Sequence, residues 1–244
     1  MRKYFKYFIY LYVFIGFSSA EAGSFDAFFR AIKLDNDATV SSLIAVGFDP
    51  NSPSENLTPA LIVAIESDAT KTAKLLLHDP RTRVNVDNPQ GESALMLAAI
   101  HNQVDIAELL IAQGAEVNRP GWSPLHYAAS KGHMAMMRLL LDKSAYIDAE
   151  SPDGNTPLMM AAYYSKSPLA VKLLLEEGAD PTATNKNGNT AQELAQSANQ
   201  AQSAAYIQAF VQAWELKALA DQEAAQAEAE KEAEHPSETA SPKQ

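Results

Sequence analysis

Five histidines are the side chains in this sequence best suited to acid–base chemistry or metal binding: His78, His101, His126, His133 and His235. No set of His, Asp and Glu residues in the chain has the spacing typical of a metal site. The sequence contains no cysteine, which excludes disulfides, thiolate metal sites and cysteine nucleophiles. We therefore expect neither a bound metal nor a cofactor.

Other motifs of catalytic or ion-binding sites are also absent from the sequence. Asp153-Gly154 and Asn187-Gly188 indicate turns and not calcium loops, because the ligands that should follow them are missing. The chain has no glycine-rich phosphate loop and no Gly-x-Ser-x-Gly segment. The sequence thus predicts a protein that is not an enzyme. An active site assembled from scattered residues would leave no motif and stays as the weakest alternative.

A repeated segment organises most of the chain. The best copies are Gly121–Ala129 and Asn155–Ala162, and weaker copies begin at Leu57, Glu92 and Asn189. A hydroxyl residue opens each copy, and the five are Thr58, Ser93, Ser123, Thr156 and Thr190. Their near-regular spacing corresponds to a period of about 33 residues, which is typical of stacked supersecondary units.

Each copy predicts a pair of short helices. The Ser or Thr caps the first helix by accepting a hydrogen bond from a backbone N–H that has no partner within the helix. Pro follows at the first helical position, where no helical hydrogen bond is lost by its missing N–H. An Ala-Ala pair then allows neighbouring helices to approach closely. A break such as Lys131-Gly132-His133 precedes a second apolar helix, which ends at a glycine such as Gly114 or Gly178.

This pattern resembles the ankyrin repeat, most closely in Trp122–Asp148 and Asn155–Asp180, and the resemblance covers about residues 24–213. It implies an all-α solenoid of about five to six stacked helix-turn-helix units joined by short hairpin loops. It also implies structural hydrogen-bonding roles for His126 and His133. Its functional implication is a non-enzymatic module for protein–protein interaction.

The sequence predicts five segments along the chain. They are a signal peptide (1–22), a degenerate N-terminal capping repeat (23–56), four central ankyrin repeats (57–187), a C-terminal capping repeat or helix (188–219) and a disordered Ala/Glu-rich tail (220–244). The first part of that tail has the alternative of extending the cap helix, because Ala and Glu favour helix. Six residues are expected to cover the last interior face: Ala205, Ile207, Ala209, Phe210, Ala213 and Trp214.

The segment Met1–Ala22 has the organisation of a secretory leader. Three cations precede the apolar run Phe8–Phe17, and small residues ending at Ala22 fit cleavage before Gly23. The run is short beside the roughly 20 apolar residues of a spanning helix. Cleavage predicts a periplasmic or secreted bacterial protein, whereas a retained leader predicts a membrane-tethered scaffold. The leader carries a net charge of +2, so its removal changes the formal charge from −11 to −13.

The acidic charge argues against a nucleic-acid partner, whose phosphates would be repelled. We expect a monomer that binds an unidentified folded protein, and no membrane association once the leader is removed. The role would be that of a scaffold or of a protective or inhibitory binder. An immunity protein that neutralises a toxin or an enzyme is a more specific version of the same prediction.

The resemblance places partner contacts just before the capping hydroxyl and just after the Ala-Ala pair, on the concave face. Four apolar or aromatic residues occupy such positions, and Trp122 is the strongest candidate among them: Ile100, Trp122, Tyr163 and Tyr164. Four polar residues complete the predicted contact set: Glu92, His101, Lys131 and Asn155. The alternative is that the aromatic side chains pack on neighbouring repeats.

Overall fold

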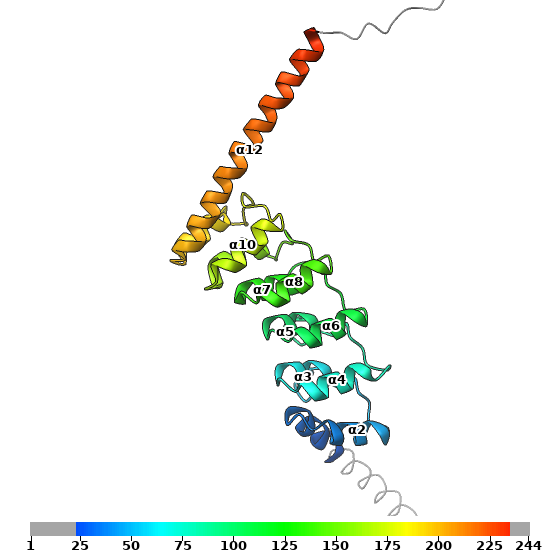
Figure 1. Ribbon diagram of the computed structural model, residues 1–244. Coiled ribbons are helices and arrows are strands. Elements are labelled where there is room, and N and C mark those ends of the chain that lie inside the picture. The colour runs from blue at the N-terminus through cyan, green and yellow to red at the C-terminus, as the bar shows by residue number, and fades with distance from the viewer. Residues whose placement is uncertain (1–22, 235–244) are drawn as a thin grey trace, which may run out of the picture.

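The computed structural model describes residues 23–234, with side chains to residue 227, as a stack of helix pairs followed by one long helix (Figure 1). The predicted leader and the residues after 234 lie outside this part. Residues 23–33 are helical. The later helices are α2 (Asp37–Ala45), α3 (Ala60–Glu66), α4 (Thr70–His78), α5 (Ala94–Ile100), α6 (Val104–Ala112), α7 (Pro124–Lys131), α8 (Met134–Asp142), α9 (Pro157–Tyr164), α10 (Pro168–Glu176), α11 (Ala191–Ser197) and α12 (Ala201–Glu234).

The helices form two rows. Helices α3, α5, α7, α9 and α11 contact one another in sequence, and α2, α4, α6, α8, α10 and α12 do the same (Figure 1). We call the surface made by residues 23–33, the first of these rows and the preceding hairpin turns the groove face. It is the face on which the sequence predicts partner contacts. The predicted all-α repeat solenoid is confirmed.

Capping hydroxyls start most first-row helices as expected. Ser93 accepts from the backbone N–H of Met96 at 3.2 Å, and Thr156 from that of Met159 at 3.4 Å. In α3 the N-cap is Pro59 and not Thr58, so our alignment of this repeat was wrong by one residue. Thr58 is instead held in the hairpin, where its carbonyl accepts from the N–H of Ser54 at 2.8 Å.

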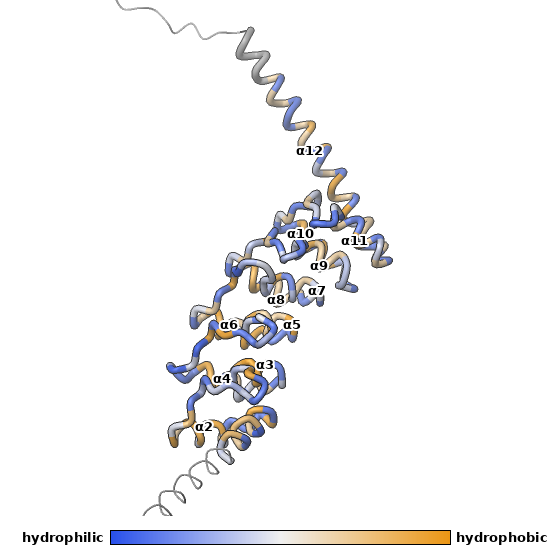
Figure 2. Tube along the Cα trace, turned by 180° about the vertical axis from the view of Figure 1, so that it is seen from behind, coloured by the Kyte–Doolittle hydropathy of each residue, from blue (hydrophilic) through white to orange (hydrophobic). Residues whose placement is uncertain are grey.

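Small and apolar side chains form one core that continues through the whole stack. The Ala-Ala pairs of α5, α7 and α9 are fully buried: Ala98, Ala99, Ala128, Ala129, Ala161 and Ala162. Second-row helices complete the core with side chains such as Ile106, Leu110 and Met136. Figure 2 shows hydrophobic residues concentrated in the paired helices, whereas the coloured part of α12 is mixed.

The hairpin turns share one backbone hydrogen bond, from an N–H to the carbonyl four residues later. It joins Ser54 to Thr58, Asn88 to Glu92, Ser151 to Asn155 and Asn185 to Asn189. The turn before α7 is three residues shorter than the next two turns and has no such bond among the described residues. There, Arg119 forms an ion pair with Asp87 of the preceding repeat at 2.6 Å.

Helix α12 continues far beyond the stack (Figure 1). It buries Ser203, Ala204 and Ile207, whereas four residues expected on the last interior face are exposed: Ala205, Ala209, Ala213 and Trp214. Every described side chain from residue 212 to 227 is exposed. We expected residues 220–244 to be disordered, but the structure shows helix as far as Glu234. Residues 235–244 lie outside the described part. Within residues 23–234, no helix is both long enough and apolar enough to cross a membrane.

Candidate functional site

Two of the histidines have structural roles. The Nδ1 atom of His126 accepts from the backbone N–H of Ser123 at 3.1 Å, so its Nε2–H donates to the carbonyl of Asn155 at 2.9 Å. Burial lowers the pKa of His126, which keeps the ring neutral. His133 contacts the carbonyl of Ile100 through Nε2 at 3.0 Å. Both rings therefore join one repeat to the next, as the resemblance implied.

The other described histidines, His78 and His101, are exposed. Across the described residues, no cluster of three or more His, Asp, Glu or Cys side chains could hold a metal ion. His101 borders an open hollow of about 310 Å³ that Asp68 and Asp105 also line. His235 lies outside the described part of the chain.

Trp122 lies on the groove face but is half-buried. Its ring centroid is 5.5 Å from that of His126 and 6.1 Å from that of Tyr127, with edge-to-face geometry in both contacts. The ring therefore packs on the first turn of α7. Part of Trp122 remains accessible, but much of its surface is already used inside the repeat.

Glu92 and Tyr127 form a bridge across the centre of the groove face. The Tyr127 hydroxyl donates to Glu92 Oε1 at 3.0 Å, and Asn88 Nδ2 donates to Glu92 Oε2 at 2.9 Å. Burial and the nearby Glu92 carboxylate together raise the pKa of Tyr127 to about 12. The predicted contact residue Glu92 is thus committed to a bond between two repeats.

Tyr163 and Tyr164 are the exposed aromatic pair of the groove face. Their side chains are 41% and 59% exposed, and their ring centroids are 4.7 Å apart at the end of α9. They border an open pocket of about 160 Å³ whose lining contains no charged side chain. We call it the tyrosine pocket, and its lining residues are Asn155, Met159, Met160, Tyr163, Tyr164, Asn185, Asn187, Asn189 and Leu194.

Asparagine amides form the polar side of the tyrosine pocket. Asn185 Nδ2 donates to Asn155 Oδ1 at 2.9 Å, and Asn185 Oδ1 accepts from the N–H groups of Asn187 and Asn189 at 3.0 Å. The amide side chains of Asn187 and Asn189 make no hydrogen bond within the described residues. They therefore offer donors and acceptors to a bound group. The structure brings the predicted residues Asn155, Tyr163 and Tyr164 together here.

The remaining predicted residues do not share this pocket. Ile100 is partly buried against the core, and its carbonyl is the acceptor for His133. Lys131 is exposed at the end of α7, one residue before Gly132. Neither residue lines the tyrosine pocket. The predicted contact set is therefore spread along the groove face instead of forming one site.

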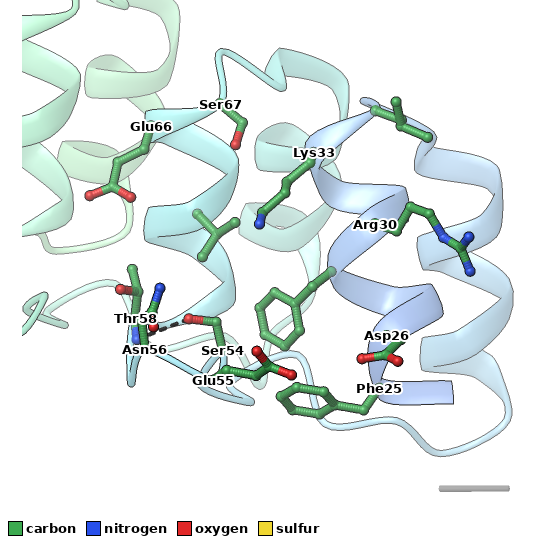
Figure 3. A pocket seen from close by; sticks show the side chains of 13 residues that line it. Phe25, Asp26, Arg30, Lys33, Ser54, Glu55, Asn56, Thr58, Glu66 and Ser67 are labelled. Carbon is green, nitrogen blue, oxygen red and sulfur yellow. Dashed lines mark hydrogen bonds between the residues drawn. The ribbon is translucent and has the colours of Figure 1, made fainter. Parts of the chain in front are cut away.

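A second hollow on the groove face was not predicted from the sequence. It is an open cleft of about 660 Å³ between helical residues 23–33 and α3 (Figure 3). Its lining includes Phe29 and Val63, which are both buried. Its rim carries both signs of charge: Asp26, Arg30, Lys33, Glu55 and Glu66. Figure 3 shows Lys33 reaching toward α3, with Glu55 beside Phe25.

The two repeats that border this cleft lack the Ala-Ala pair of the later repeats. The first-row helices α3 and α5 end with the same backbone hydrogen bond, which allows their repeats to be aligned. The N–H of Ala69 donates to the carbonyl of Ala64 at 2.9 Å, and the N–H of Gln103 donates to the carbonyl of Ala98 at 2.9 Å. Ile65 is therefore equivalent to Ala99. The same bond from Asn36 to Ala31 aligns Ile32 with these residues. Two buried isoleucines thus stand where later repeats have the second alanine of the pair. The missing Ala-Ala pair is the sequence feature that distinguishes the two repeats on either side of the cleft.

The stacked helix pairs, hairpin turns and buried alanine pairs define a helical repeat protein of the solenoid class. A family model for ankyrin repeats (3 copies) matches residues 28–121 and 117–185. This chain belongs to the ankyrin repeat family. Ankyrin repeats are generally non-catalytic modules that bind other proteins.

Several curated proteins are similar to part of the chain. It is 34% identical over 147 residues to Ankyrin repeat and SOCS box protein 6 of Homo sapiens, which covers 56% of this chain and 35% of the relative. It is 33% identical over 132 residues to the nuclear factor NF-kappa-B p105 subunit of Mus musculus, and this match covers 51% of this chain and 14% of the relative. It is 31% identical over 154 residues to the tyrosine-protein kinase Shark of Drosophila melanogaster, and this match covers 62% of this chain and 16% of the relative. The chain thus spans about a third or less of these relatives.

Proposed function

We propose that this chain is an exported, non-enzymatic binding module that holds a folded protein partner on its groove face, at the tyrosine pocket. The observation that carries this proposal is the exposed pair Tyr163 and Tyr164 beside the free amides of Asn187 and Asn189. Tyrosine is among the residues most often found as energetic anchors of protein interfaces. Its ring supplies apolar contact area, and its hydroxyl supplies a hydrogen bond.

The pocket sits on a rigid support. Helix α9 contacts both α7 and α11, and its residues Leu158, Met159, Ala161 and Ala162 are buried. A preformed surface loses little conformational entropy when it binds. This rigidity suits a scaffold or an inhibitory or protective binder. An immunity protein that covers a toxin or an enzyme is one form of such a binder.

The pocket's chemistry limits what its partner presents. Its lining offers amide, phenol and thioether groups and no charged side chain. An exposed loop of the partner, with backbone peptide groups and one apolar or aromatic side chain, matches this lining. An isolated charge would be poorly compensated there, because a charge removed from water needs a counter-charge.

A capture experiment tests this proposal. The bait is residues 23–244, and the test variant is Tyr163→Ala/Tyr164→Ala. The matched control is Tyr146→Ala/Leu169→Ala, which removes two exposed side chains outside the pocket. We expect a protein from a bacterial envelope extract to bind the natural bait and the control but not the test variant. Equal capture by all three baits, or by none, would overturn the proposal.

Export is part of the same proposal and has its own measurement. Three cations, a short apolar run and small residues before Gly23 support a cleaved leader. Mass spectrometry of the protein from cells that secrete it should then give a chain beginning at Gly23. A chain that begins at Met1 and sediments with membranes would favour the tethered scaffold instead.

A further inference from the structure

The cleft between helical residues 23–33 and α3 combines apolar surface with charges of both signs. Phe25, Phe29 and Val63 contribute apolar side chains to its lining. Its five ionisable side chains are all exposed, and none of them forms an ion pair within residues 23–234: Asp26, Arg30, Lys33, Glu55 and Glu66. Their charges are therefore available to a bound group.

These charges follow an order along the cleft. Asp26, Arg30 and Lys33 are four and three residues apart, so they share one face of their helix, and about 10 Å along its axis separates the first from the last. Glu55, in the hairpin turn, adds a second carboxylate near the Asp26 end, which we call the hairpin end (Figure 3). Glu66 lies on α3, across the cleft from Lys33. The hairpin end thus has two carboxylates, whereas the other end has two cations and one carboxylate.

Leu57 lies in the hairpin turn that borders the cleft, between the lining residues Asn56 and Thr58. Its backbone N–H donates to the carbonyl of Ser54 at 2.8 Å, three residues earlier. In three later turns a glycine makes this same bond: Gly91, Gly154 and Gly188. Leu57 therefore stands at a glycine position, and its φ of +61° compares with +75° to +81° for those glycines.

A leucine at this position is unfavourable for the fold in two ways. A side chain with a β-carbon is strained in the left-handed region, and the apolar side chain of Leu57 is 71% exposed. Apart from glycines, the other described residues with a positive φ are all Asp, Asn or Ser: Asp35, Asp68, Asn102, Ser144 and Asn199. Strained residues of this kind cluster at sites that contact ligands. Leu57 therefore fits a role in binding better than a role in stability.

We infer that the cleft and Leu57 form a docking site for an extended segment of another protein, one that carries a basic and an acidic residue three or four positions apart. The basic side chain lies at the hairpin end, near Asp26 and Glu55. The acidic side chain lies near Arg30 and Lys33. An extended chain advances about 3.3 Å per residue, so three residues span the distance between the two ends. An apolar side chain between the two charges contacts Leu57 and the apolar lining.

This docking site is separate from the tyrosine pocket, because no residue lines both. A segment bound in the cleft should therefore bind the variant Tyr163→Ala/Tyr164→Ala as well as the natural chain. Failure of one proposal leaves the other standing.

A library of random heptapeptides displayed on phage tests the expected chemistry. The library is selected on residues 23–244 carrying Tyr163→Ala/Tyr164→Ala, so that peptides specific for the tyrosine pocket are not recovered. We expect the enriched peptides to carry a basic and an acidic residue three or four positions apart, with an apolar residue between them. No enrichment, or enriched peptides without this pattern, would overturn the inference.

Charge reversal tests whether these peptides occupy the cleft, with fluorescence anisotropy of labelled peptides as the measurement. Arg30→Glu/Lys33→Glu should raise the dissociation constant by about tenfold or more. The control Arg138→Glu/Lys143→Glu makes the same change in net charge at two exposed residues outside the cleft and should leave the constant nearly unchanged. A peptide whose acidic residue is replaced by Lys should bind the natural chain weakly and regain affinity for Arg30→Glu/Lys33→Glu. Equal binding to the two variants, or no regained affinity, would contradict the site.

Substitution of Leu57 separates binding from stability. Glycine adopts a positive φ without strain, so Leu57→Gly should unfold at the same or a higher urea concentration than the natural chain. The same variant should bind the enriched peptides about fivefold or more weakly. Leu57→Asn, which also tolerates the left-handed region but keeps a β-carbon, should weaken binding in the same way. Undiminished binding by both variants, or weaker binding that accompanies a loss of stability, would overturn the role of Leu57 as a contact.

Discussion

The hydroxyl of Tyr127 donates a hydrogen bond of 3.0 Å to the carboxylate of Glu92, one repeat earlier in the chain. This bond joins α7 to the turn before α5, and Trp122 packs on the Tyr127 ring. The centre of the groove face is therefore closed by its own side chains. The tyrosine pocket and the cleft beside residues 23–33 are open hollows nearer the two ends of the stack.

Removing the Tyr127 hydroxyl should weaken the contact between these two repeats. We expect Tyr127→Phe to lower the free energy of unfolding by about 1 kcal/mol, the usual size for a partly exposed hydrogen bond. Urea denaturation followed by circular dichroism measures the change. Tyr146→Phe is the control, because Tyr146 is exposed and its hydroxyl makes no hydrogen bond within the described residues. Equal stability of the two variants would show that the bridge contributes nothing.

His126 should make the stability of the stack depend on pH. Burial lowers its pKa in the folded state, so the unfolded chain takes up a proton first as the pH falls below about 6.5. Its stabilising contribution is complete above that pH and is lost as the pH falls toward the folded-state pKa. The loss is at most about 1.4 kcal/mol for each pH unit.

The variant His126→Gln removes this titration and provides the comparison. Free energies of unfolding are measured at pH 8 and pH 5.5 for both proteins. The natural chain should lose more stability between the two values than the variant. If both lose the same amount, the ring is not held neutral by the fold.

Gly132 connects α7 to α8 in a left-handed conformation with φ of +69°. A β-carbon at this position would lie 2.5 Å from Ser165 Oγ and 3.0 Å from Ser167 Cβ in the next repeat. Gly132→Ala should therefore cost more than the ~1–2 kcal/mol of left-handed strain alone. Gly178→Ala, at φ of +98° with no atom within 4 Å, should show only that strain in thermal denaturation.

The repeat fold could be predicted because its local signals agree with its packing. Capping hydroxyls, prolines and alanine pairs recur at matching places in successive repeats, and each has a structural role that the helices confirm. The alignment of the second repeat was the exception. Thr58-Pro59 has the form of a cap, but the Thr58 carbonyl and N–H are both used in the hairpin.

The site was harder to predict, because exposure depends on neighbours distant in sequence. Trp122 and Tyr163 both occupy predicted contact positions, yet Trp122 is half-buried against His126 and Tyr127, whereas Tyr163 is 41% exposed. The cleft beside residues 23–33 is lined by residues from two repeats, such as Phe29 and Val63, and the sequence does not show that they lie together. The helical extension of α12 follows from its alanine and glutamate content.

The central claim is that a partner protein contacts the tyrosine pocket. Its most direct test is photo-crosslinking in cells, with a photoreactive amino acid placed at Tyr164 in one variant and at Tyr146 in another. We expect a specific adduct with one other protein from position 164 and none from position 146, which is at least as exposed. Adducts from position 146 alone, or from neither position, would contradict the claim.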